Sequence, residues 1–210
     1  MTGILPVTAT SPVGTTEDRR LASACAAGDT GVFEEIYQRF GDRMKSIAWN
    51  HLGSRSDAED AVQETFLKIH RAAKTYSGEA SFSTWVFRIL VNTCYDVLRK
   101  RRRRIEEAPI DDTPETAERT APNIDEAKRM TLRKLLSELT EQRRTVFTLF
   151  EIEGLSHAEI AEILGISEGN SKWILFATKK ELQEKWLRGR GVTGSPPPRN
   201  PETSQPRNHQ

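Results

Sequence analysis

The chain has 210 residues, of which 29% are charged and 7% are aromatic, and its formal net charge is +1. This length accommodates one large domain or two small ones, and the small net charge argues against a uniformly basic, general nucleic-acid binder. The sequence also lacks a signal-peptide pattern and any apolar run near the ~20 residues that a membrane span needs.

The first predicted helices follow a segment without apolar periodicity. Residues 1–16 are rich in Thr, Pro and Gly, and we expect them to be disordered. A helical pattern then stops at Gly28, and Asp29 is a good N-cap for the next helix, which we expect to end at Gly41. Apolar residues at helical spacing predict a third helix, which Gly53 closes.

Two longer amphipathic helices complete the first predicted domain. Ser56 and Glu59 have the spacing of a capping box, which predicts the start of a fourth helix. After a polar loop at residues 74–80, we expect a fifth helix over residues 81–103. No stretch alternates with the period of two that a strand requires, so residues 17–104 are interpreted as an all-α domain.

Charge is distributed unevenly after the fifth helix. Six consecutive basic residues, Arg99 to Arg104, form what we call the basic run. Eight acidic residues and a single arginine follow between Ile105 and Glu126, together with three prolines. Because such segments repel themselves and remain solvated, residues 105–127 are predicted to be an acidic flexible linker.

The second predicted domain, residues 128–188, contains the pattern of a helix-turn-helix. A capping box at residues 156–159 starts one helix, Gly165 supplies a turn that needs positive φ, and Ser167 caps the next helix. This arrangement usually places the second helix in the DNA major groove, although an ordinary αα-hairpin has a similar pattern. Residues 189–210, with five prolines, are expected to be a disordered tail.

The second helix of this motif carries the residues predicted to contact duplex DNA. Asn can read adenine through two hydrogen bonds, and Lys can contact guanine or phosphate. Three large apolar residues, Trp173, Ile174 and Phe176, could instead contact thymine methyl groups, pack on a neighbouring helix or bind a protein. The candidate DNA-binding residues of this helix are Ser167, Asn170, Ser171, Lys172, Trp173, Phe176, Lys179 and Lys180.

The fourth helix of the first domain offers a candidate docking surface. Acidic and polar residues beside an aromatic ring suit a basic partner surface, although acids in a first helical turn also complement the helix dipole. The candidate docking residues are Asp60, Gln63, Glu64 and Phe66.

The polar loop and the fifth helix combine aromatic side chains with cations. Aromatic rings stack on unpaired bases and cations follow the phosphates, so this region is a candidate single-strand site. Core packing is the alternative for the rings, and we assign Phe82 and Trp85 to the core but expect Tyr76 to be difficult to bury. The candidate DNA-binding residues here are Tyr76, Arg88, Asn92, Arg99, Lys100 and Arg101, with Phe87 and Tyr95 as further aromatic residues.

The sequence contains no motif of catalysis, metal binding or cofactor binding. The four histidines are scattered, and Cys25 and Cys94 lack metal or disulfide spacing. There is no glycine-rich phosphate loop and no nucleophile motif. We therefore expect no enzymatic activity, no cofactor and no metal site, and the isolated thiols fit a reducing cytoplasm.

Two segments resemble a known family. We identify a resemblance to region 2 of bacterial RNA polymerase sigma factors, of the extracytoplasmic-function group, in SDAEDAVQETFLKIHRA and SFSTWVFRILVNTCYDVLRKRRRR. A resemblance to region 4 is carried by LTEQRRTVFTLFEIEGLSHAEIAEILGISEGNSK. Together they cover about residues 20–185. The resemblance implies two small helical domains joined by the linker.

The resemblance also implies a function and a role for each candidate surface. The four docking candidates would contact the clamp helices of the β and β′ subunits of core RNA polymerase. The loop at residues 74–80 and Asn92 would read flipped bases of the minus-ten element, and residues 167–180 would read the minus-thirty-five duplex. The linker would extend toward the RNA exit path. The implied protein directs core polymerase to promoters and promotes DNA melting, and an anti-sigma factor is a further candidate partner.

The chain departs from the family pattern in the recognition helix. Ile174 and Ala177 stand where the group commonly has arginines, so we expect weak upstream binding with a shallow salt dependence. Restoring both arginines is expected to strengthen that binding. Two other functions stay open: a helix-turn-helix regulator that acts without core polymerase, and a polymerase or anti-sigma interaction module that has lost upstream DNA reading.

Overall fold

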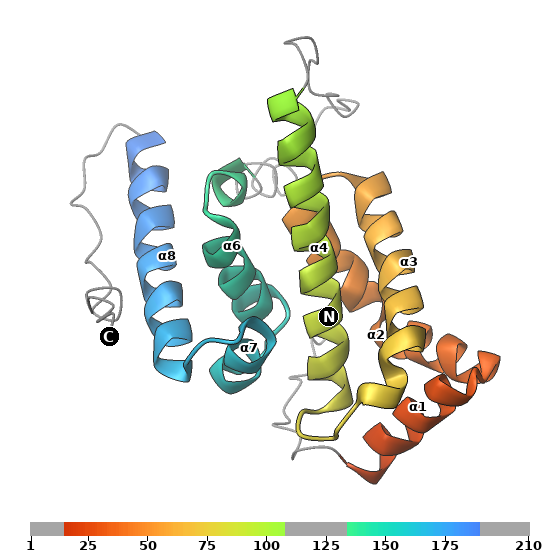
Figure 1. Ribbon diagram of the computed structural model, residues 1–210. Helices are drawn as coiled ribbons and strands as arrows, with labels where there is room; N and C mark the ends of the chain where they lie inside the picture. The colour runs from red at the N-terminus through yellow and green to blue at the C-terminus, as the bar shows by residue number, and fades with distance from the viewer. Residues whose placement is uncertain (1–14, 108–133, 190–210) are drawn as a thin grey trace, which may run out of the picture. The chain divides into compact units, whose positions relative to one another are not determined.

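Every regular element in the described part of the chain is helical. The computed structural model describes residues 15–107 and 134–189, which fall into two compact units (Figure 1). The predicted all-α class is therefore confirmed. The expectations for residues 1–14, 108–133 and 190–210 lie outside the described residues, and the predicted domain boundaries stay predictions. Among the described helices, none has the length and apolar character to cross a membrane.

Helix α1 (Thr16–Ala27) opens the first unit and is closed at both ends by local signals. The Thr15 hydroxyl accepts the amide of Asp18 and the Asp18 carboxylate accepts the amide of Thr15, so the helix begins with a capping box. Gly28 ends it in the left-handed conformation, as predicted. Cys25 is fully buried.

Helix α2 (Thr30–Leu52) is one helix of 23 residues where the sequence predicts two. The prediction that Gly41 ends the first of them is wrong, because Gly41 lies inside the helix and is buried. An interior glycine costs a helix about 1 kcal/mol relative to alanine, and burial of Phe40 and Met44 beside it offsets that cost. Packing also favours glycine, since a Cβ atom there would lie 3.2 Å from the Tyr37 ring and the ring would have to shift.

Helix α3 (Arg55–Ala72) begins earlier than predicted. The side chain of Ser54, and not that of Ser56, accepts the amide of Asp57 and caps the helix. The two serines are too close in sequence for spacing alone to distinguish them. A short 3₁₀ helix, η1 (Ala73–Thr75), follows α3.

Helix α4 (Phe82–Glu107) completes the first unit and packs against both α2 and α3 (Figure 1). Phe82, assigned to the core from the sequence, is fully buried, and so are Val86 and Leu90, whereas Trp85, assigned to the core as well, is only half-buried. Because two helices cover it, α4 buries a wider stripe than the sequence predicts, and this stripe also includes Phe87, Val91 and Cys94.

The second unit contains residues 134–137, which are helical, followed by four elements. These are α6 (Glu141–Phe147), the π-helical turn η2 (Thr148–Ile152), α7 (His157–Leu164) and α8 (Glu168–Gly189). Leu136 and Leu139, which helical spacing places on one stripe with Leu132, form a buried cluster with Leu182 of α8. Leu132, predicted in the same stripe, lies outside the described residues. Thr140 holds the N-cap position of α6, but its side chain makes no capping hydrogen bond.

Helices α7 and α8 form the predicted helix-turn-helix. Ser156 and Glu159 make both hydrogen bonds of a capping box at the start of α7. Gly165 ends α7 at φ 65°, a conformation that only glycine adopts readily. The Ser167 hydroxyl then accepts the amide of Asn170 at 3.0 Å, which starts α8. The turn between the helices is therefore specified locally.

Candidate nucleic-acid interface

The outer face of α3 carries the predicted docking residues. Asp60 and Gln63 are exposed, whereas Glu64 and Phe66 are half-buried. The Phe66 ring packs at a tilt against Tyr37 of α2, with 6.0 Å between the ring centroids. The face is therefore a polar ridge with an aromatic edge, shared between two helices.

Sequence reasoning missed part of this aromatic edge. Helical spacing predicts that Tyr37 faces inward, but it is 42% exposed, and Leu67 is 51% exposed. Lys45 donates a hydrogen bond to the Tyr37 hydroxyl at 2.6 Å, and this bond raises the pKa of Lys45. The ammonium group also lies 4.8 Å from the centre of the Tyr37 ring, so Lys45 holds the ring against α2.

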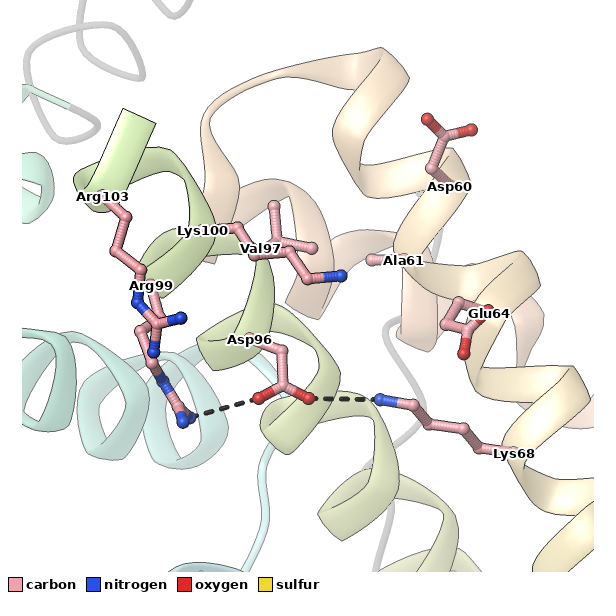
Figure 2. Close-up of a pocket in the computed structure, with 9 residues that line it drawn as sticks. All are labelled: Asp60, Ala61, Glu64, Lys68, Asp96, Val97, Arg99, Lys100 and Arg103. Atoms are coloured by element: carbon pink, nitrogen blue, oxygen red, sulfur yellow. Dashed lines mark hydrogen bonds and ion pairs between the residues drawn. The ribbon is translucent and has the colours of Figure 1, made fainter. Parts of the chain in front are cut away.

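A groove of about 510 Å³ separates α3 from the C-terminal half of α4 (Figure 2). Asp96 lies at its centre and pairs with cations from both helices. Its carboxylate accepts from Lys68 of α3 at 3.3 Å and from Arg99 of α4 at 3.1 Å. Lys68 also donates to the Thr93 hydroxyl at 3.1 Å, so the predicted DNA-binding residue Arg99 belongs to a network that joins the two helices.

The two walls of this groove carry opposite charges beyond that network. Asp60 and Glu64 line it from α3, and Lys100 and Arg103 line it from α4 (Figure 2). The basic run is exposed along its whole length. Two of the predicted docking residues, Asp60 and Glu64, thus border the same groove as the predicted phosphate-binding residues Arg99 and Lys100, although they were predicted as separate surfaces.

The loop at residues 74–80 is held by its own aromatic residue. The Tyr76 hydroxyl donates to the Ala80 carbonyl at 2.6 Å, and its ring meets Phe82 and Trp85 edge-on at 5.8 and 5.5 Å. The expectation that Tyr76 resists burial is therefore wrong in part, because the ring is half-buried. Gly78 turns the loop at φ 79°.

The remaining candidates on α4 differ in accessibility. Asn92 is exposed, whereas Arg88 and Tyr95 are half-buried. Phe87 is fully buried and packs edge-on against Phe40 at 6.0 Å, so it cannot stack on a base. Its inclusion among the stacking aromatics is a prediction that the structure corrects, because α2 covers that side of α4.

The outer face of α8 presents cations around an aromatic side chain. Lys172, Phe176 and Lys179 are exposed, and Phe176 is 60% exposed. Trp173, Asn170 and Lys180 are half-buried, and Ser167 is exposed at the N-terminus. Four of the eight candidate residues of this helix, Ser167, Lys172, Phe176 and Lys179, are therefore exposed.

Three positions of α8 face inward instead. Ile174 is 4% exposed, and Ala177 is fully buried, so the two positions at which arginines were expected belong to the core. The premise that arginines at these positions would face DNA is therefore wrong, whereas their effect on DNA binding stays a prediction. Ser171, predicted to bind DNA, is also fully buried.

Ser171 contacts a histidine that sequence reasoning set aside. Its hydroxyl lies 3.0 Å from Nδ1 of His157 at the start of α7. The imidazole stacks on Phe150 of η2 at 4.4 Å. Desolvation, and then the charge of Lys172, lowers the pKa of His157. A histidine directly after a capping serine was the available signal, but nothing in the sequence identified its partners.

Ion pairs neutralise part of the charge on α8. Lys172 pairs with Glu168 at 2.6 Å, and Lys179 pairs with Glu151 of η2 at 2.6 Å. Because an exposed pair is weak, a phosphate can replace either carboxylate. The net attraction of α8 for DNA is nevertheless smaller than its lysines alone suggest.

The cysteines and acidic groups form no further site in the described residues. Burial raises the pKa of Cys25 to about 11 and that of Cys94 to about 12, so both thiols stay protonated near neutral pH. No cluster of three or more His, Cys, Asp or Glu residues suited to a metal ion occurs within the described ranges.

Comparisons with known proteins match both units. The family model for Sigma-70 region 2 matches residues 36–104, and that for Sigma-70 region 4 matches residues 129–182. The chain is 32% identical over 155 residues to ECF RNA polymerase sigma factor SigM of Mycobacterium tuberculosis, covering 74% of this chain and 77% of the relative. It is 29% identical over 184 residues to the ECF RNA polymerase sigma-E factor of Haemophilus influenzae, covering 80% and 94%.

Solved structures share the fold. CnrH in complex with the cytosolic domain of CnrY matches with a TM-score of 0.63 at 23% identity, covering 82% of this chain and 97% of CnrH. The sigma factor RpoE of Bartonella quintana, solved with the anti-sigma factor NepR, matches with a TM-score of 0.61 at 23% identity, covering 72% and 94%. With both regions matched and a relative above 30% identity, the chain belongs to the extracytoplasmic-function group of the sigma-70 family of RNA polymerase sigma factors.

Proposed function

We propose that the chain acts as a sigma factor through three surfaces, on α3, on the loop and α4, and on α8, the first two of which border one groove. It binds core RNA polymerase, directs it to promoters and promotes opening of the DNA. The observation that carries the proposal is the presence, in one chain, of a region 2 bundle with an aromatic-basic helix and a region 4 helix-turn-helix. A regulator that bound only duplex DNA would need the second unit alone.

The α3 ridge is the proposed polymerase contact. Asp60, Gln63 and Glu64 supply acceptors for a basic partner surface, and Phe66 with Tyr37 supplies apolar area at its edge. Protein–protein interfaces commonly combine aromatic and polar contacts of this kind.

The loop and α4 are the proposed site for melted DNA. Unstacking a base costs a few kcal/mol, and stacking on an aromatic ring returns roughly 1–3 kcal/mol. Tyr76 and Trp85 are half-buried and can offer a ring face or edge, and exposed Asn92 can hydrogen-bond to a base. Half-buried Arg88 and the exposed Arg99, Lys100 and Arg101 would bind the backbone phosphates.

The outer face of α8 is the proposed contact with the minus-thirty-five duplex. Ser167 and Asn170 lie at the N-terminal end of the helix, which enters the groove first in this motif. Lys172, Lys179 and Lys180 would contact phosphate or guanine, and Trp173 and Phe176 would contact thymine methyl groups. Ser171 is retained only as a buried residue that positions His157.

The proposed action is binding without turnover, in the cytoplasm where core polymerase is found. Neither unit is expected to hold a promoter tightly alone, because each contact is modest and the shared chain supplies the effective concentration.

Run-off transcription with purified core polymerase and a randomised promoter library tests this function. We expect transcripts from a sequence-defined subset of templates only when the chain is present. If the chain binds duplex DNA but yields no transcripts with core polymerase, it is a stand-alone regulator and the proposal fails.

A further inference from the structure

Helix α1 touches the loop that we propose to hold melted DNA. A Cβ atom at Gly78 would lie 3.3 Å from Nε of Arg19 and 3.9 Å from its Nη2. Gly78 is buried, although Ser77 and Glu79 on either side of it are exposed. The Arg19 side chain therefore lies against the turn of the loop.

Arg19 is held at this place by the body of α1. The capping box of Thr15 and Asp18 fixes the first helical turn, and the Arg19 amide donates to the Thr15 carbonyl at 3.1 Å. Leu21 is fully buried, so the helix cannot rotate about its axis without losing core contacts. The backbone of Arg19 is thus rigid, while its side chain is exposed.

The Arg19 guanidinium differs from that of its neighbour in its partners. Arg20 pairs with Glu17 at 2.7 Å and with Glu35 at 2.6 Å. Within residues 15–107 and 134–189, the Arg19 side chain makes no hydrogen bond or ion pair. One exposed cation beside the loop is therefore available, and the adjacent one is neutralised.

We infer that Arg19 binds a backbone phosphate of the single-stranded DNA held at the loop of residues 74–80. A base trapped at this loop brings its phosphate with it, and that charge needs a cation within hydrogen-bond reach. A guanidinium suits the role because its donors match phosphate oxygens in pairs. The matched region 2 segment starts at residue 36, so it assigns no role to α1. The inference rests on the proposed function of the loop.

The test uses the full chain bound to core polymerase. The probe is a promoter fragment that the wild-type holoenzyme selects from the randomised library, made as a pre-melted bubble over the minus-ten region. Binding is measured by fluorescence anisotropy from about 50 to about 200 mM salt. The variants are Arg19→Met, which keeps an unbranched side chain but removes the charge, Arg19→Lys, which keeps the charge, and Arg20→Ala as the matched control.

Loss of one phosphate contact has a defined signature. At a slope of about −0.7 per phosphate, wild-type affinity should fall about 2.6-fold more than that of Arg19→Met across this fourfold salt range. Arg19→Lys and Arg20→Ala should keep the wild-type slope. An unchanged slope for Arg19→Met overturns the inference, as does an equal loss for Arg20→Ala.

The experiment gives different results if the role of Arg19 is wrong and if the proposed sigma-factor function is wrong. If the wild-type holoenzyme selects no promoter at all, both the proposed function and the inference are wrong. If it selects promoters and all variants share its slope, only the role of Arg19 is wrong.

Discussion

The basic run of α4 and the outer face of α8 are both proposed to meet DNA, but they are built differently. The basic run presents consecutive exposed cations, of which Arg99 pairs with Asp96. On α8, Lys172 and Lys179 each pair with a carboxylate, and an exposed Phe176 lies between them in sequence. Since salt dependence follows the number of phosphates neutralised, the first unit should bind with a steep salt dependence and the second with a shallow one.

The largest expected effect comes from the attempt to make α8 resemble the basic run. Ile174→Arg with Ala177→Arg places two charges in the core of the second unit and should destabilise it by about 3–5 kcal/mol or more. Urea unfolding of the full chain measures this. Phe176→Arg adds a cation to the exposed face and is the matched control, with no comparable loss expected. Greater duplex affinity without destabilisation of the double variant would show that the buried register of α8 is wrong.

The next largest effect separates polymerase docking from DNA binding. Gln63→Ala with Glu64→Lys replaces two acceptors on the α3 ridge and reverses one charge, so affinity for core polymerase should fall by about 2–5 kcal/mol. Co-purification with core polymerase and circular dichroism are the measurements. Gln38→Ala with Glu34→Lys makes the same changes at an exposed pair on α2 and should leave binding intact. If the α3 variant binds core polymerase with wild-type affinity, the α3 ridge is not the polymerase contact.

A third effect concerns strand trapping in the first unit. Tyr76→Ala and Asn92→Ala should each weaken open-complex formation on duplex promoter by about 1–3 kcal/mol, and much less on a pre-melted bubble. Permanganate footprinting on both templates measures this. Tyr76→Phe keeps the contacts with Phe82 and Trp85 but loses the hydrogen bond to Ala80, so it reports on loop rigidity alone. Equal losses on both templates would show that these residues do not act by trapping unpaired bases.

A smaller effect distinguishes base recognition by α8 from its electrostatic attraction to the DNA phosphates. Asn170→Ala should relax preference at one base position by about 1–3 kcal/mol, whereas Lys172→Ala should weaken binding to every sequence and reduce the salt slope by about 1. Anisotropy with matched and scrambled duplexes separates the two outcomes. A sequence-selective effect of Lys172→Ala would reverse the assigned roles.

The smallest expected effect is a pH dependence confined to the second unit. Because the pKa of His157 is lowered in the folded state, the neutral imidazole is favoured by folding. Its stabilising contribution is present above the unfolded pKa of about 6.5 and is lost as pH falls through the lower folded pKa. Between pH 7 and pH 5, the Tm of the wild type should therefore fall further than that of His157→Gln. If the Tm of the two proteins falls equally with pH, protonation of His157 does not contribute to the pH dependence of stability.

The fold was predictable where short sequence patterns specify backbone geometry. The caps at Asp29 and Ser156 and the turn at Gly165 lie where the sequence predicts them. Errors occurred where two signals compete locally. Gly41 is a common helix terminator, yet a buried apolar stripe continues through it, and Ser54 and Ser56 offer equivalent caps only two residues apart.

The candidate site was predictable in outline, but the burial of several of its side chains was not. Exposed Asp60, Gln63, Asn92, Lys172 and Phe176 agree with the predicted faces, while the roles of all candidate residues stay predictions. Ser171 and Phe87 were misplaced because the sequence does not say how many neighbours cover a helix. For the same reason, the sequence did not indicate that Tyr37 is exposed or that His157 contacts Ser171.

By itself, the sequence determined the helical class, the helix-turn-helix and the family, because these depend on residues within a few positions of one another or on the order of short motifs along the chain. Only the tertiary structure decided that Ile174 and Ala177 are core residues, that the α3 and α4 surfaces border one groove, and that Arg19 lies against Gly78. Each of these facts joins residues far apart in sequence. Hydrophobic periodicity identifies a buried stripe, but it does not identify the surface that covers it.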